Sequence, residues 1–182
     1  MPNKLRELIL LRHAKSEWKN TDLADMDRPL SDKGKKSAAK LGKWLKTESL
    51  TPDLILVSPA KRAQQTLRRI SSENSVNTVT VDELYLADLE TLLKVLSETP
   101  PASRVMIIGH NQGLERLLSY LQHDDSDDTT DTSPAQNENP DRVHLFPTAS
   151  LAHFVLPYDW NSLEEGDGKL IQFIRAKDIT LN

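Results

Sequence analysis

Residues 8–16 read LILLRHAKS, and the arrangement of the rest of the chain follows from them. The four apolar residues 8–11 predict a short buried strand. This strand ends at Arg12 and His13, so it brings two cation-capable groups to its carboxyl end. In open α/β sheets that edge is where ligands bind. A guanidinium held beside an imidazole there is suited to binding or attacking a phosphoryl group.

An Arg-His pair after a single strand is a weak signal, because such side chains can simply solvate a strand end. Two further strands strengthen it. Residues 54–57 predict a buried strand that stops at Ser58, with Arg62 one helical turn later. A further strand, over residues 104–108, breaks before His110. If these strands run parallel, their ends share one edge, and a bound oxyanion would offset the repulsion between the gathered cations.

The remaining pattern alternates strands with helices. Apolar periodicity predicts helices over residues 32–47, 60–70, 89–96 and 114–121, and strands over residues 78–81, 146–156 and 169–175. Ser31 is the expected N-cap of the first helix. This order predicts an α/β fold with three αβα layers, in which a mostly parallel central sheet carries helices on both faces.

The composition limits the class of protein to which this chain can belong. The chain has 182 residues, 37% of them hydrophobic and 27% charged, which fits one domain over residues 1–182. The net charge of −4 argues against nucleic-acid binding. The absence of cysteine excludes a disulfide framework and a thiolate nucleophile. With no apolar run near the ~20 residues that span a bilayer and no signal-peptide pattern, we expect a cytoplasmic protein without membrane contact.

Residues 124–141 are rich in Asp, Ser, Thr and Pro and nearly lack apolar residues, so they predict a flexible acidic insertion. The lysines of residues 32–47 are most simply a solvated helix face. Lys15, Ser16 and Thr148 could reach the rim of the predicted pocket, although a surface position is the simpler interpretation. Trp18 is interpreted as a packing residue.

Several catalytic motifs are missing, and their absence reduces the number of reactions that the predicted site could catalyse. The sequence contains no Walker loop and no HExxH, and its histidines and acids show no metal-ligand spacing, so we expect neither a metal nor another cofactor. What remains is nucleophilic catalysis by an imidazole. Cationic groups would stabilise the phosphoryl oxygens, and a carboxylic acid would protonate the leaving group and then activate water.

Five segments carry a family resemblance. They are RHAKS at 12–16, DRPLS at 27–31, SPAKRAQQT at 58–66, GHNQGLE at 109–115 and FPTA at 146–149. Together they resemble the histidine phosphatase (phosphoglycerate mutase-like) superfamily. The segments at 12–16, 27–31, 109–115 and 146–149 resemble in particular its SixA-type phosphohistidine phosphatases. The resemblance covers nearly the whole chain outside the acidic insertion. It implies a phosphoglycerate mutase-like fold.

The resemblance also implies roles for particular residues. His13 would be the nucleophile that accepts the phosphoryl group as a transient phosphohistidine. Arg12, Arg62 and His110 would line the phosphate pocket and act in catalysis. Arg28, on the loop before the first long helix, would be a further substrate contact.

The acid/base group is less well defined. Glu83 matches the family's acid position best, and Asp25 and Asp27 are alternative candidates for the general acid/base. A phosphoramidate such as phosphohistidine needs less help from an acid than an alkoxide leaving group does, and the short chain agrees with such a substrate.

The expected function is therefore hydrolysis of phosphohistidine or another phosphomonoester, and the expected partner is a phosphorylated protein or a small phosphorylated metabolite. A small-molecule phosphatase or mutase of the same superfamily is one alternative, although the missing capping insertion argues against a mutase. An inactive phosphate-binding module is another, although such a module would not need His13.

Overall fold

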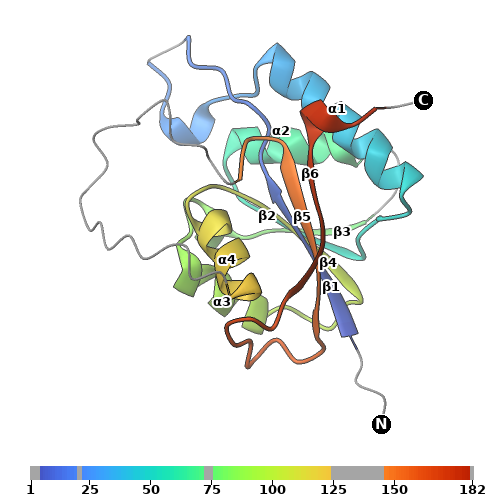
Figure 1. Ribbon diagram of the computed structural model, residues 1–182. Coiled ribbons are helices and arrows are strands. Elements are labelled where there is room, and N and C mark those ends of the chain that lie inside the picture. The colour runs from blue at the N-terminus through green and yellow to red at the C-terminus, as the bar shows by residue number, and fades with distance from the viewer. Residues whose placement is uncertain (1–4, 20–21, 72–75, 124–145, 181–182) are drawn as a thin grey trace.

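The computed structural model describes residues 5–19, 22–71, 76–123 and 146–180. These residues form one mixed sheet with the strand order β3-β2-β4-β1-β5-β6 (Figure 1). The strands are β1 (Leu5–Arg12), β2 (Leu54–Val57), β3 (Asn77–Thr80), β4 (Arg104–Gly109), β5 (Ser150–Pro157) and β6 (Lys169–Arg175). Strands β1 to β4 run parallel, β5 runs antiparallel to β1, and β6 runs antiparallel to β5. The predicted mostly parallel sheet is confirmed.

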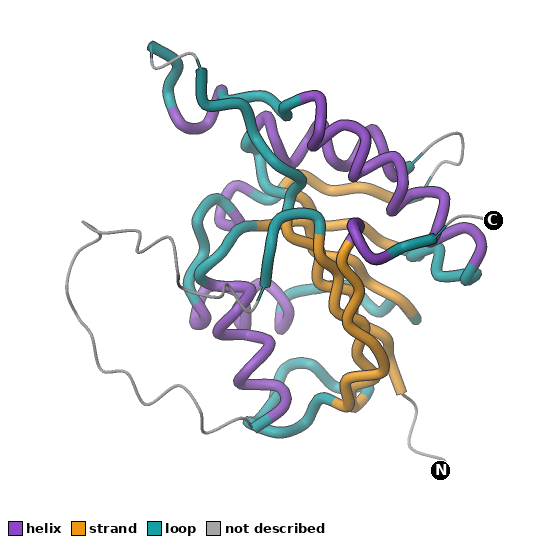
Figure 2. Tube along the Cα trace, turned by 45° about the horizontal axis from the view of Figure 1, so that its top comes forward, coloured by secondary structure: helices purple, strands orange, loops and turns teal. Residues whose placement is uncertain are grey.

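Helices cover both faces of this sheet (Figure 2). The α-helices are α1 (Asp32–Thr47), α2 (Lys61–Ile70), α3 (Leu89–Ser97) and α4 (Gly113–Gln122), and the short 3-10 helices are η1 (Asp25–Asp27), η2 (Asp82–Leu84) and η4 (Ala176–Asp178). Helices α1 and α2 pack together on one side, and α3 and α4 pack together on the other. The predicted three-layer αβα fold is confirmed.

Side-chain alternation along β1 explains why both faces need helices. Leu8 and Leu10 point into the core shared with α3 and α4, whereas Ile9 and Leu11 point into the core shared with α1 and α2. All four are completely buried. Burying each such side chain contributes roughly 1.5–3 kcal/mol, so the run of residues 8–11 fixes β1 at the centre of the sheet.

The expected N-cap is present, since the Ser31 side chain accepts a hydrogen bond from the Gly34 backbone N–H at 3.1 Å. The strand predicted from residue 146 was wrong at its start, because β5 begins at Ser150. Ala149 has a φ of +55°, and the Ser150 N–H donates to the Pro147 carbonyl, so a turn precedes the strand.

The acidic insertion predicted at 124–141 lies outside the described residues, and the single domain over 1–182 stays a prediction. Within the described ranges, no helix is long and apolar enough to cross a membrane.

Candidate active site

The carboxyl ends of three neighbouring strands meet in the structure. Strand β4 lies between β1 and β2, and backbone hydrogen bonds continue past the strand ends. The His13 N–H donates to the Gly109 carbonyl at 3.1 Å, and the Ser58 N–H donates to the Ile108 carbonyl at 3.0 Å. The residues that follow each strand therefore lie side by side. A pocket of about 530 Å³ opens at this edge.

His13 is buried near the floor of this pocket, with 7% of its surface exposed. Its Nδ1 lies 2.8 Å from the Ala14 carbonyl oxygen, which can only accept a hydrogen bond. The proton is therefore on Nδ1, and Nε2 keeps its lone pair. Arg62 Nε donates to that Nε2 at 3.2 Å. Burial lowers the pKa of His13 to about 3, and the neighbouring His110 and Arg62 act in the same direction. The ring is neutral, as a nucleophile requires.

The second imidazole faces the first. The ring centroids of His110 and His13 lie 5.1 Å apart. Arg62 Nη2 approaches His110 Nδ1 at 3.4 Å, and a guanidinium only donates, so the proton of His110 is on Nε2. That Nε2 lies 2.7 Å from Ser58 Oγ. Burial lowers the pKa of His110 to about 4, with the Arg62 charge adding to the effect.

Arg62 lies in the first turn of α2 and connects the two histidines to a carboxylate. Its Nη1 donates to the Asp25 carbonyl at 2.6 Å, and its Nη2 pairs with Asp25 Oδ2 at 2.9 Å. One turn later, Thr66 Oγ1 accepts from the Ala14 N–H at 3.0 Å and donates to the Arg62 carbonyl at 2.8 Å. These two bonds tie α2 to the His13 loop.

Arg12 enters the pocket from the end of β1. Its Nη1 donates to the Phe146 carbonyl at 2.9 Å. Asn111 Nδ2 donates to the same carbonyl at 3.0 Å and to Glu115 Oε2 at 2.8 Å. The segment before β5 is thus anchored beside Arg12 by two side chains.

Arg28 also lines the pocket, from the loop that carries η1. It pairs with Asp25 Oδ1 at 3.3 Å and donates to Ser16 Oγ at 3.4 Å. Its guanidinium lies 3.0 Å from the centroid of the Trp18 ring, an attractive cation–π arrangement. Trp18 is 64% exposed and lines the pocket, so it packs against Arg28 at the pocket and not in the core.

Among the three acid/base candidates, only Asp25 lines the pocket. Glu83 and Asp27 are exposed and do not line it. The 3-10 turn of η2 is followed by Tyr85, whose hydroxyl donates to Asp25 Oδ2 at 2.7 Å. Burial raises the pKa of Asp25, but hydrogen bonds from Tyr85 and Arg62 outweigh it and leave that pKa lowered.

The structure therefore brings Arg12, His13, Arg62 and His110 together, adds Arg28 at their side, and leaves Glu83 apart. Asp25 lies in the short 3-10 helix η1, and Tyr85 and Trp18 lie in loops, so none of the three is in a segment with apolar periodicity; only Asp25 had been a candidate. Within the described part of the chain, no group of three or more His, Cys, Asp or Glu residues is arranged to hold a metal ion. Chemically, the pocket offers a neutral imidazole nitrogen surrounded by guanidinium donors.

Comparisons with known proteins bear on the family and the fold. The model of the histidine phosphatase superfamily (branch 1) matches residues 8–90. The candidate phosphohistidine phosphatase SixA from Agrobacterium tumefaciens is 29% identical, with a TM-score of 0.73 over 93% of this chain and 97% of its own. The corresponding candidate from Nakamurella multipartitia is 25% identical, with a TM-score of 0.74 over 94% and 96%.

An uncharacterized chloroplastic protein of Arabidopsis thaliana is 38% identical over 64% of this chain, and the match spans 59% of that protein's length. The resemblance to the histidine phosphatase superfamily, and to its SixA-type phosphohistidine phosphatases, is therefore confirmed, and the fold is phosphoglycerate mutase-like.

Proposed function

We propose that this protein is a metal-independent phosphatase that hydrolyses phosphohistidine or other phosphomonoesters through a phosphohistidine intermediate on His13. The observation that carries the proposal is the pair of hydrogen bonds made by the two ring nitrogens of His13. Its Nδ1–H is held by the Ala14 carbonyl, and its Nε2 lone pair is directed toward Arg62 in a cationic pocket.

In the proposed first step, an incoming phosphoryl group displaces Arg62 Nε from His13 Nε2. The Nε2 lone pair attacks phosphorus in line, a nitrogen–phosphorus bond forms, and the bond to the leaving group breaks. Arg12 and Arg62 donate to the phosphoryl oxygens, where negative charge is spread in the transition state, and His110 joins them when its Nε2–H leaves Ser58 Oγ for a phosphoryl oxygen. The Nδ1–H keeps its hydrogen bond to the Ala14 carbonyl, and this bond stabilises the positive charge that develops on the ring.

In the second step, water attacks phosphorus, an oxygen–phosphorus bond forms, the nitrogen–phosphorus bond breaks, inorganic phosphate leaves, and His13 becomes neutral again. Asp25 is the carboxylate best placed to take the proton of this water, because it lines the pocket and its lowered pKa keeps it charged. A charged Asp25 is a poor proton donor. Phosphohistidine suits such a site, since its imidazole leaving group needs less acid assistance than an alkoxide does.

The test is hydrolysis of p-nitrophenyl phosphate and of phosphoimidazole, with EDTA present. We expect His13→Ala to lose at least about a thousandfold in rate, as removal of a nucleophile does. His123→Asn is the matched control, because His123 is exposed and does not line the pocket. Circular dichroism shows whether each variant is folded.

A rapid acid-free quench should also trap phosphate on the wild-type protein, stable in alkali and labile in acid. A folded His13→Ala protein that keeps its activity would exclude His13 as the acceptor. Wild-type protein that binds phosphate without turnover would instead indicate an inactive phosphate-binding module, and transfer of the phosphoryl group to a second hydroxyl would indicate a mutase.

A further inference from the structure

The pocket is larger than its phosphate-binding floor. A volume of about 530 Å³ lies in the range that holds small organic ligands. The buried residues His13, Arg62 and His110 form the floor. Three exposed lysines, Lys15, Lys33 and Lys177, also line the pocket, and they belong to its rim. A phosphoryl group on the floor leaves room above it in the pocket for a leaving group, and these three cations border that room.

Two of the lysines are held in place by one backbone contact. The Lys15 carbonyl accepts hydrogen bonds from the Ser31 N–H at 2.9 Å and from Ser31 Oγ at 3.1 Å. Gly34 lets this carbonyl lie directly against α1, since a Cβ there would be 2.1 Å from the Lys15 oxygen. Lys15 on the His13 loop and Lys33 in the first turn of α1 therefore have fixed backbone positions beside the same pocket.

The third lysine comes from the other end of the chain. Lys177 lies in η4, and the Ala176 N–H before it donates to the Ala149 carbonyl at 2.9 Å. Ala176 is buried, so η4 is packed onto the pocket rim. Arg175 also lines the pocket, but Asp178 pairs with it and offsets its charge.

The charge of this rim is not balanced. In the part of the chain that the structure describes, Lys15, Lys33 and Lys177 have no carboxylate within ion-pair distance. Seven lysine or arginine residues line the pocket against one carboxylate, Asp25, which is occupied by Arg62 and Arg28. This occurs in a protein whose net charge is −4. A cleft lined by one sign of charge concentrates ligands of the opposite sign.

We propose that Lys15, Lys33 and Lys177 form a second anion subsite, which binds a carboxylate or phosphate carried on the leaving group. The substrate class is thus a phosphorylated compound with a second negative charge beyond the transferred phosphoryl group. This inference rests on the proposed function, because it takes the phosphoryl group to occupy the floor next to His13.

Substituted phenyl phosphates test the preference directly. We would compare hydrolysis of 4-carboxyphenyl phosphate with that of its neutral analogue, 4-carbamoylphenyl phosphate. The wild-type protein should favour the carboxylate in kcat/KM by about tenfold, the combined effect of a few partly exposed ion pairs. In the triple variant Lys15→Gln, Lys33→Gln, Lys177→Gln this ratio should fall to about one, because the pairs are removed.

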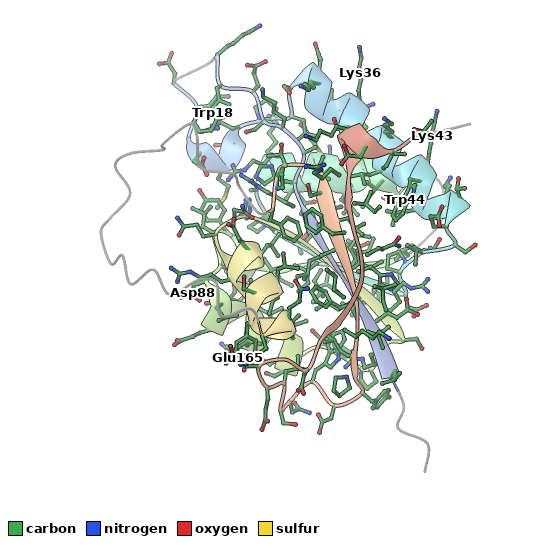
Figure 3. The ribbon with its side chains drawn as sticks, viewed as in Figure 1. Trp18, Lys36, Lys43, Trp44, Asp88 and Glu165 are labelled. Carbon is green, nitrogen blue, oxygen red and sulfur yellow. The ribbon has the colours of Figure 1, made fainter. Side chains whose placement is uncertain are left out.

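Lys36→Gln is the matched control. Lys36 lies on the same helix as Lys33, does not line the pocket, and points outward from α1 (Figure 3). We expect this variant to keep the wild-type preference. An equal loss of preference in the control would show that long-range charge, and not a subsite, is responsible, and would overturn the proposal.

Binding of non-hydrolysable phosphonates separates the subsite from turnover. We expect 4-carboxybenzyl phosphonate to bind wild-type protein more tightly than 4-carbamoylbenzyl phosphonate in calorimetry, and the triple variant to bind both alike. If the protein binds with this preference but hydrolyses nothing, the proposed function fails and the subsite stands. If it hydrolyses both phenyl phosphates without preference, the function stands and the subsite is excluded.

A final arm identifies the source of the second anion. Phosphohistidine peptides with Glu or Gln flanking the phosphorylated residue would be compared in wild type and triple variant. A preference for Glu that the triple variant loses assigns the subsite to an acidic side chain of a protein substrate. A preference confined to the phenyl phosphates assigns it to a small metabolite.

Discussion

The Asp25 carboxylate pairs with Arg62 and with Arg28, so it occupies cations that a phosphoryl group would bind, and the Asp25 backbone carbonyl accepts a further hydrogen bond from Arg62. We predict that Asp25→Asn lowers kcat for p-nitrophenyl phosphate by about 10- to 100-fold, because the water loses its base. The same change should tighten the binding of inorganic phosphate, since Arg62 and Arg28 lose the negative charge that they pair with. Steady-state kinetics with phosphate as product inhibitor measures both effects.

Glu83→Gln is the control for that experiment, because Glu83 is exposed and does not line the pocket. We expect its kcat to stay within about twofold of wild type, as for surface substitutions away from a site. The opposite pattern, with a loss in Glu83→Gln and none in Asp25→Asn, would return the acid/base role to Glu83.

For individual site residues, the sequence was informative where the side chain follows the end of a predicted strand. Arg12, His13, Arg62 and His110 meet because parallel strands share a carboxyl edge, and that follows from apolar runs and motif order. Asp25 could not be chosen over Glu83 in this way. Its position depends on how an irregular loop folds back over α2, and no periodicity encodes such a path.

The packing of α1 against the His13 loop depends on Gly34. A Cβ there would lie 2.1 Å from the Lys15 carbonyl oxygen, so either the loop or the helix must move. We predict that Gly34→Ala lowers the free energy of unfolding by about 2–4 kcal/mol through overpacking. It should also weaken phosphate binding, because the displaced loop carries His13. Urea denaturation and phosphate titration measure the two effects.

Gly109→Ala provides the comparison. Gly109 is buried at the end of β4, but a Cβ there would meet only side-chain atoms at 3.7 Å or more, an ordinary contact. We expect a change below about 1 kcal/mol for this variant. Equal effects of the two substitutions would show that loss of a buried glycine, and not the contact with Lys15, sets the cost.

The predicted helices and strands agree closely with the structure, because each amphipathic helix has a clear period and the central buried strands are short apolar runs. The bounds of α1, Asp32–Thr47, are those predicted. The start of β5 was misplaced because Phe146 is apolar and completely buried, as a strand residue would be, yet it lies in a turn. The apolar character of Phe146 correctly predicts that it is buried, but not that it lies outside the strand. The positive φ of Ala149 belongs to the turn that precedes β5.

Across the whole molecule, the fold gathers cations from distant parts of the sequence around two histidines that stay neutral. Burial lowers the pKa of His13 to about 3 and that of His110 to about 4. Both titrate near 6.5 in the unfolded chain. Below pH 6.5 the unfolded state therefore binds protons that the folded state does not, until the pH reaches the folded pKa values.

It follows that acid should destabilise the protein through these two groups. Stability is highest above pH 6.5 and falls as the pH drops toward 4, with a limiting slope of about 1.4 kcal/mol per pH unit for each histidine. We predict that the double variant His13→Asn, His110→Asn has a shallower decline than wild type between pH 6.5 and 4.5. Urea denaturation in phosphate-free buffers of constant ionic strength measures these slopes, and parallel curves for wild type and double variant would contradict neutral burial of the two rings.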